Sequence, residues 1–140
     1  MPKFLDPVVI AVAPASGTHA ANKTYVDGRP KIEVFTIPGT LIVGAGAEIP
    51  MPFAMTITNV RVRIKTAPTG ASAIFDLNKN GTTMFTTQGN RPTVTAGNNQ
   101  DLSSVPDVTS LAAGDYLSVD CDQIGSTVAG ANAVLVVEYT

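Results

Sequence analysis

The sequence contains little of several residue types, and each shortage excludes a class of protein. A single cysteine, Cys121, can form neither an internal disulfide nor a cysteine-based zinc site. Tryptophan is absent, and charged residues make up 14% of the chain, against about 25% in a typical globular protein. Long amphipathic helices need Glu, Lys, Arg and Leu, which are scarce here. The formal net charge of −2 argues against nucleic-acid binding, which needs a strongly basic face.

Long apolar runs are also missing. Residues 8–13 form an apolar segment, but it is far shorter than the roughly 18 residues that a membrane span requires. Asp6 and Pro7 interrupt the apolar region that a signal peptide would need, and Lys3 is the only basic residue before it. We therefore expect a protein that is made in the cytoplasm, carries no cleaved leader and does not bind a membrane.

Sets of residues that could support catalysis are also scarce. A Ser-His-Asp or Cys-His pair would have to use His19, the one histidine, which lies far from any predicted cleft. No glycine-rich phosphate loop follows a strand and opens a helix. Asp115, Asp120 and Asp122 lie close in sequence, but alternation turns Asp120 and Asp122 outward, which favours a solvated strand face over paired catalytic carboxylates. We expect no enzyme and no cofactor.

A possible calcium loop has a simpler interpretation. The stretch from Asp76 to Gly81 fits the first half of the pattern D-x-[DN]-x-[DN]-G, but Thr87 stands where the bidentate carboxylate should be. Strand patterning flanks the stretch, and Asn80-Gly81 supplies the two positive φ values of a type I′ turn. The sequence predicts a β-hairpin without a metal, with Asn78 opposite Thr83 and Leu77 opposite Met84.

Alternation of apolar and polar residues is the dominant pattern. Val60, Val62 and Ile64 share one face of a predicted strand, since successive side chains of a strand point to opposite faces. Met55 and Ile57 alternate in the opposite phase, which predicts a bulge or bend near residue 59.

Further strands are expected along the rest of the chain. The predicted segments are residues 31–37, with Ile32 and Val34 on one face, the two strands of the hairpin, 93–96, 116–122 and 133–139. Cys121 is predicted to be a buried thiol because it alternates with Leu117 and Val119. Residues 133–139 are apolar on both faces, so this strand is either central or covered by a neighbour.

The segments between these strands are predicted to be irregular. Glycines at 44–46 should break the chain, and residues 48–53 should be extended near a sheet edge. Residues 97–107 should contain a long loop, and residues 106–114 one helical turn. About eight short strands separated by turns indicate an all-β fold, a single jelly-roll-like antiparallel β-sandwich over residues 31–140.

Residues 1–30 differ from the rest and predict an extended N-terminal arm. Pro7 and Pro14 bracket the apolar segment 8–13, which can therefore be extended or an edge strand but not a central one. Residues 18–27 could form a short helix, with Thr18 as N-cap and Gly28 after its end. Such an arm either folds back on its own domain or lies on another subunit, and we expect the second.

One local concentration of positive charge stands out. Arg61, Arg63 and Lys65 lie about 7 Å apart on the outer face of the predicted strand. They could bind an acidic protein surface or an anionic glycan. The alternative is a solvated strand face that discourages edge-to-edge aggregation.

Two blocks of sequence resemble a known family. The blocks are GASAIFDLNKNGTTMF and, further on, PDVTSLAAGDYLSVDCDQIGSTVAGANAVLVVEYT. Together they resemble a β-sandwich domain of tailed-bacteriophage structural proteins, which often carry D-x-N-x-N-G-T-T and then L-A-A-G-D-x-L-x-V-D-x-x-Q-x-G. The matching residues are Asp76, Asn78, Asn80 to Thr83, Leu111 to Asp115, Leu117, Val119, Asp120, Gln123 and Gly125. Residues 21–27 also resemble an A-x-K-x-Y-V-D stretch of phage fibre and neck proteins.

The resemblance implies a component of the virion that catalyses no reaction. The small size of this chain and its lack of a repetitive fibre shaft favour a capsid decoration (cement) protein. Such a protein binds the major capsid protein on the outside of the head, and we expect it to do so as a homotrimer. The alternative is a receptor- or carbohydrate-binding tip of a head or tail fibre. The residues expected to contact the capsid or a neighbouring subunit are Phe4, Leu5, Val8, Val9, Ile10, Val12, Tyr25, Val26, Arg61, Arg63 and Lys65.

Overall fold

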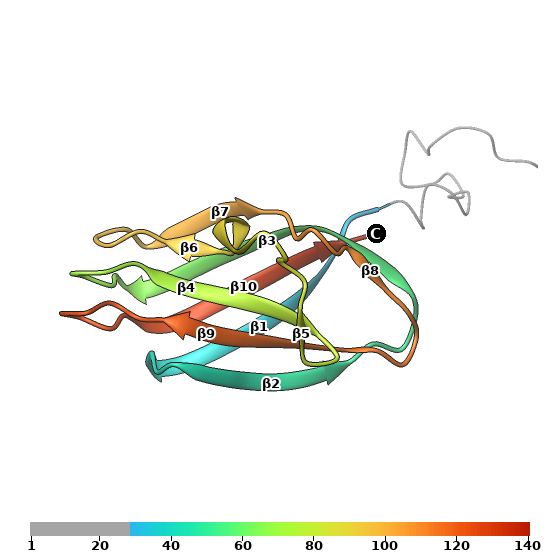
Figure 1. Cartoon of the computed structure of the whole chain (residues 1–140), viewed down its shortest axis with the longest axis horizontal. Coiled ribbons are helices and arrows are strands. Elements are labelled where there is room, and N and C mark those ends of the chain that lie inside the picture. The colour runs from blue at the N-terminus through green and yellow to red at the C-terminus, as the bar shows by residue number, and fades with distance from the viewer. Residues whose placement is uncertain (1–28) are drawn as a thin grey trace, which may run out of the picture.

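A computed structural model describes residues 29–140, and the predicted arm with its short helix lies outside the described residues. Two antiparallel sheets pack face to face (Figure 1). Sheet A has the order β1 (Lys31–Thr40), β10 (Ala131–Tyr139), β3 (Met55–Thr66) and β7 (Gln100–Ser104), and β8 (Ser110–Leu111) also pairs with β3. Sheet B has the order β2 (Gly44–Pro50), β9 (Tyr116–Gln123), β4 (Ala73–Lys79) and β5 (Thr82–Thr83), and β6 (Thr93–Val94) also pairs with β4. A 3-10 turn, η1 (Gln88–Asn90), precedes β6.

The order of the strands is that of a jelly roll. The first four strands alternate between the sheets, so β1 and β3 lie in sheet A while β2 and β4 lie in sheet B. The last two long strands return to fill the gaps, β9 between β2 and β4 and β10 between β1 and β3. The predicted all-β, jelly-roll-like sandwich is confirmed.

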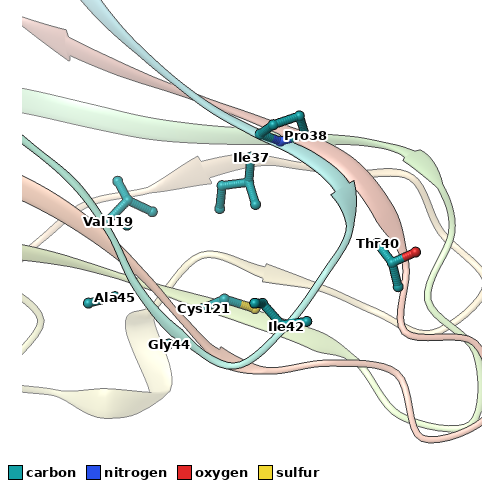
Figure 2. Close-up of a pocket in the computed structure, with 9 residues that line it drawn as sticks. Ile37, Pro38, Thr40, Ile42, Gly44, Ala45, Val119 and Cys121 are labelled. Carbon is teal, nitrogen blue, oxygen red and sulfur yellow. The ribbon is translucent and has the colours of Figure 1, made fainter.

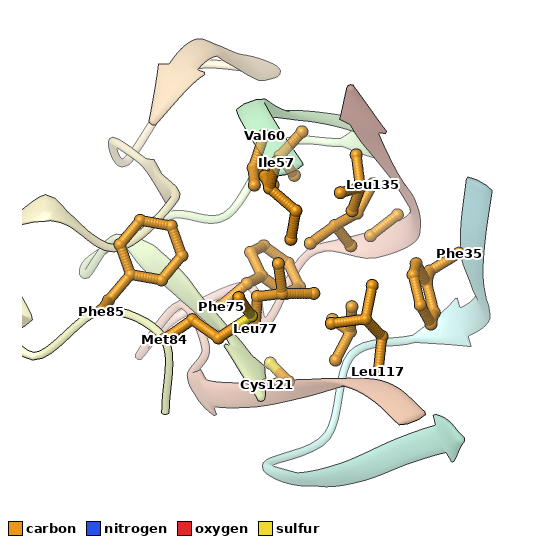
Figure 3. Close-up of a cluster of buried hydrophobic side chains, with 14 of the residues drawn as sticks. Phe35, Ile57, Val60, Phe75, Leu77, Met84, Phe85, Leu117, Cys121 and Leu135 are labelled. Carbon is orange, nitrogen blue, oxygen red and sulfur yellow. The ribbon is translucent and has the colours of Figure 1, made fainter. Parts of the chain in front are cut away.

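The core lies between the sheets and is built from the inward faces of alternating strands. Val60 of β3 lies across the core from Phe75 and Leu77 of β4 (Figure 3). These three residues, like Val62 and Ile64 of β3, are each at most 2% exposed. Burying a side chain of this size contributes about 1.5–3 kcal/mol. Cys121 is 2% exposed within this cluster, so the predicted buried thiol is confirmed, and burial raises its pKa to about 11.

A bulge in β3 places the apolar residues before it and those after it on the same inward face, although the two sets alternate in opposite phase. Glu138 of β10 is opposite Asn59, while the next residue, Tyr139, is opposite Ile57, so Thr58 has no partner. This extra residue lets Ile57 and Val60 both point inward. The bulge predicted near residue 59 is confirmed.

The β4–β5 hairpin is also confirmed. Asn80 and Gly81 have φ values of 51° and 77°, as a type I′ turn requires. Lys79 is opposite Thr82, and the Met84 amide donates to the Leu77 carbonyl at 2.8 Å. The hairpin places Leu77 and Met84, both fully buried, on the same face.

The prediction that glycines break the chain at residues 44–46 is wrong, because β2 begins at Gly44. Gly46 lies so close to β9 that an added Cβ would be 2.5 Å from the Val119 carbonyl oxygen. Glycine is needed here because two paired strands approach each other closely, and not because the chain turns. The expected edge position is confirmed, since β2 is the edge strand of sheet B.

Two predictions in the second half of the chain are also wrong. The predicted long loop at residues 97–107 contains β7, and the predicted helical turn at residues 106–114 contains β8. Neither strand has a strong local preference. Both form because β3 offers a free edge: the Ser104 amide donates to Asn59 Oδ1 at 3.1 Å, and Leu111 pairs with Met55.

Candidate partner-binding surface

The outer surface of sheet A combines apolar and basic side chains on adjacent strands. Phe35, Leu135 and Val62 point into the core, so their neighbours along each strand point outward. Val34 of β1 is opposite Val136 of β10, and Val136 is opposite Arg61 of β3. We call this surface the sheet A face and define it by Ile32, Val34, Val134, Val136, Arg61, Arg63 and Lys65.

The β1 side of the sheet A face is apolar. Ile32 is 59% exposed and Val34 is 42% exposed, while Val134 and Val136 next to them are half-buried. Single exposed apolar residues are common, whereas several adjoining ones are typical of surfaces that bind another molecule. Sequence reasoning did not assign these residues to the surface. The sequence did carry a signal for an apolar outer surface, since residues 133–139 are apolar on both faces. These residues form β10, the central strand between β1 and β3.

The β3 side of the sheet A face is basic. Arg61 forms an ion pair with Glu138 of β10, and this contact lowers the pKa of the Glu138 carboxyl group. Arg63 Nη1 donates to Gln100 Oε1 of β7 at 3.2 Å. Within residues 29–140 neither Arg63 nor Lys65 forms an ion pair with a carboxylate, so both charges are available to a partner.

The structure places part of the predicted contact set. Arg61, Arg63 and Lys65 lie together on an exposed face, as their alternation indicates, and their role in binding stays a prediction. The remaining predicted contacts lie outside the described residues: Phe4, Leu5, Val8, Val9, Ile10, Val12, Tyr25 and Val26.

The outer surface of sheet B is polar and acidic, and much of it is enclosed. Asp76 of β4 is opposite Asp120 of β9 and is 7% exposed; desolvation, and then the charge of Asp122, raise its pKa. Asp76 Oδ1 accepts a hydrogen bond from the Thr83 hydroxyl at 2.9 Å. Arg91 pairs with Asp122, reaching it from the loop before β6.

The expectation that Asp120 lies on a solvated strand face is wrong. Asn78 Nδ2 donates to Asp120 Oδ2 at 2.8 Å, and Asp120 Oδ1 is enclosed without a hydrogen-bond partner. Asp122, two residues on, is exposed as expected. Over the described part of the chain, no group of three or more acidic, histidine or cysteine side chains has the geometry of a metal site.

Comparisons with protein-family models, with curated proteins and with solved structures find no match for this chain. The resemblance to phage proteins therefore rests on the sequence blocks quoted above. No helix among residues 29–140 has the length and apolar character needed to cross a membrane.

Proposed function

We propose that this protein is a capsid decoration protein of a tailed bacteriophage, which binds the outside of the assembled head as a trimer and reinforces capsomer junctions. One observation carries the proposal: the sheet A face combines exposed apolar and basic side chains on one surface of a two-sheet scaffold. The resemblance of residues 70–85 and 106–140 to phage virion proteins supplies the class of partner.

The chemistry of the sheet A face fits a protein partner with an apolar patch and adjoining carboxylates. Ile32 and Val34 would lose exposed apolar surface on contact, which contributes about 25 cal/mol for each Å² removed from water. Arg63 and Lys65 would select an acidic surface and orient the encounter. Because a capsid repeats its surface many times, a modest affinity per subunit suffices when three subunits bind together.

The arm supplies the second set of contacts in this proposal. Residues 4–13 and Tyr25-Val26 are predicted to contact the capsid or a neighbouring subunit. An extended segment offers much contact area per residue, although ordering it on binding lowers the net affinity.

Co-sedimentation with purified phage heads tests the sheet A face. Val34→Asp and Arg63→Glu should each weaken binding at least about tenfold, which corresponds to about 1.4 kcal/mol. Val128→Asp is the matched control, because Val128 is 42% exposed like Val34 but lies in the loop before β10, outside the sheet A face. Wild-type binding by both sheet A variants, with the control also unchanged, would contradict the proposal.

A receptor- or carbohydrate-binding tip is the second candidate. A polar hollow of about 420 Å³ lies beside Asn90, Arg91 and Asp101, and could accept a sugar. Sugar sites also use aromatic platforms, however. Tyr116 and Tyr139 lie within strands, and the Phe53 ring packs against Tyr139 with 6.4 Å between ring centroids. Specific binding on a glycan array would favour this candidate.

A further inference from the structure

An apolar groove runs along the side of the sandwich where the chain passes from sheet A to sheet B. β1 and β2 are the edge strands of their sheets on this side, and the turn between them closes one end. The groove has a volume of about 230 Å³. The side chains that surround it are Ile37, Pro38, Thr40, Ile42, Val119 and Cys121 (Figure 2).

The groove is open because β2 carries little side-chain bulk where it faces the core. Gly44 is opposite Cys121 of β9, and no atom lies within 4 Å of the position that a Cβ on Gly44 would take. Ile42, which lines the groove, is 74% exposed and is the most exposed large apolar side chain among the described residues. An apolar segment laid here would cover it.

The strand beside the groove also offers hydrogen bonds. Within the described residues β1 pairs with β10 along one edge and with nothing along the other. A ten-residue edge strand with apolar side chains can pair with an added strand. The backbone of the added strand would extend the sheet, and its side chains would enter the groove. The occupant should therefore be extended and apolar.

We propose that residues 8–13 of the same chain occupy this groove in the isolated protein. The segment reads VVIAVA and carries no charge, and its alternation would turn Val8, Ile10 and Val12 to one face. Pro7 and Pro14 flank it, which suits a strand added at an edge. The inference does not depend on capsid binding.

The length of the intervening chain favours the same molecule over a second copy. From the start of β1 to the groove beside Ile37 is about 20–25 Å, at roughly 3.3 Å for each strand residue. The 16 residues from 14 to 29 can cover this distance, since they would reach about 24 Å if wholly helical and about 53 Å if wholly extended. A tether that can span the required distance raises the effective concentration of the segment at the groove, so the same chain outcompetes a neighbour in dilute solution. The groove thus favours an arm folded back on its own domain in the isolated protein, whereas the sequence alone led us to expect contact with another subunit. Contact of residues 8–13 with the capsid would require their release from the groove.

Disulfide trapping in the full-length chain tests the proposal, because Cys121 is the single cysteine and lines the groove. Val8→Cys, Ile10→Cys and Val12→Cys are oxidised with glutathione disulfide at about pH 9, and the products are separated without reductant. At least one variant should form a monomeric, internally linked product at least tenfold faster than Val9→Cys or Ala11→Cys. The raised pKa of Cys121 slows every variant equally.

Matched variants control for accidental contact. Adding Ile42→Ser should slow the trapping several-fold, whereas Leu102→Ser, at an exposed apolar residue on the opposite edge of sheet A, should leave it unchanged. Cys121→Ser should abolish the product. Equal rates at all five arm positions, or no linked product, would overturn the proposal. A disulfide-linked dimer in place of the monomer would overturn it in favour of a second copy.

Discussion

Asp115 joins three segments of the chain through one carboxylate. Its Oδ1 accepts from Asn80 Nδ2 at 2.7 Å, and its Oδ2 accepts from the Ala112 amide at 2.7 Å. Lys79 Nζ lies 3.1 Å from the same Oδ2. Asn80 in turn accepts from the Tyr116 amide at 2.9 Å, so the tip of the β4–β5 hairpin is tied to the start of β9.

These contacts make folding stability depend on pH. The Ala112 amide, then the Asn80 and Lys79 side chains, lower the pKa of Asp115 from 3.8 to about 2. As the pH falls, the unfolded chain binds the proton first, so the stabilisation is complete above about pH 4 and is lost towards pH 2. Asp115→Asn should therefore lose less stability than wild type between pH 5 and about 2.5 in urea unfolding.

Glu48→Gln is the matched control for that measurement, because no side-chain hydrogen bond or ion pair involves Glu48 among the described residues. It should follow the wild-type pH dependence. A wild-type slope for Asp115→Asn would show that the carboxylate does not hold the loop.

For individual residues, the sequence predicts conformations that depend on neighbouring residues in the chain. Asn80-Gly81 identifies its own turn, because two positive φ values are needed at adjacent positions. The partner of Asn80 is Asp115, which is 35 residues away, and no local pattern indicates that contact. Asp120 shows the same limit: alternation places its side chain outside the core, but the enclosure of its Oδ1 comes from packing that a strand pattern cannot show.

The face to which each side chain of a strand points depends on the register of that strand with its neighbours, and β3 shows this most clearly. Thr58 has no partner on β10, and it offsets the alternation so that Ile57 and Val60 share the inward face. Deleting Thr58 would restore regular pairing and keep both residues inward. We expect that variant to fold, with a loss of at most about 2 kcal/mol in the free energy of unfolding.

Deleting Arg61 instead provides the contrast. It removes one residue from the regular part of β3. Either the bulge at Thr58 closes, so that Val60 turns to solvent and Asn59 turns into the core, or the bulge stays and the apolar residues before Arg61 all turn to solvent. We expect no cooperative unfolding transition for this variant. Circular dichroism and urea titration of both deletions decide the matter, and equal stability of the two would contradict the register assigned to β3.

Other elements could not be predicted because their sequences do not specify them. β7 has the polar sequence QDLSS and forms on the edge of β3 through contacts such as Ser104 with Asn59. β2 has glycines that read as a break, yet Gly46 fits against the Val119 carbonyl. In each case pairing with a distant strand overrides the local preference.

At the scale of the whole molecule, the jelly roll separates two different outer surfaces. Sheet B carries Asp76 and Asp120, with Asp76 and one oxygen of Asp120 enclosed. Sheet A carries Ile32 and Val34 on β1 and Arg63 and Lys65 on β3, with β10 between them. The basic half of the sheet A face is predictable from alternation in one strand. The apolar half is not, because it forms only when β10 brings β1 alongside β3.

We propose that this protein attaches to the outside of a phage head rather than transforming a small molecule. Immunogold labelling of purified virions, with an antibody raised against residues 29–140, tests it most directly. We expect label distributed over the outer surface of the head, at many copies on each particle. Label confined to the tail tip, or absent from intact virions, would contradict it.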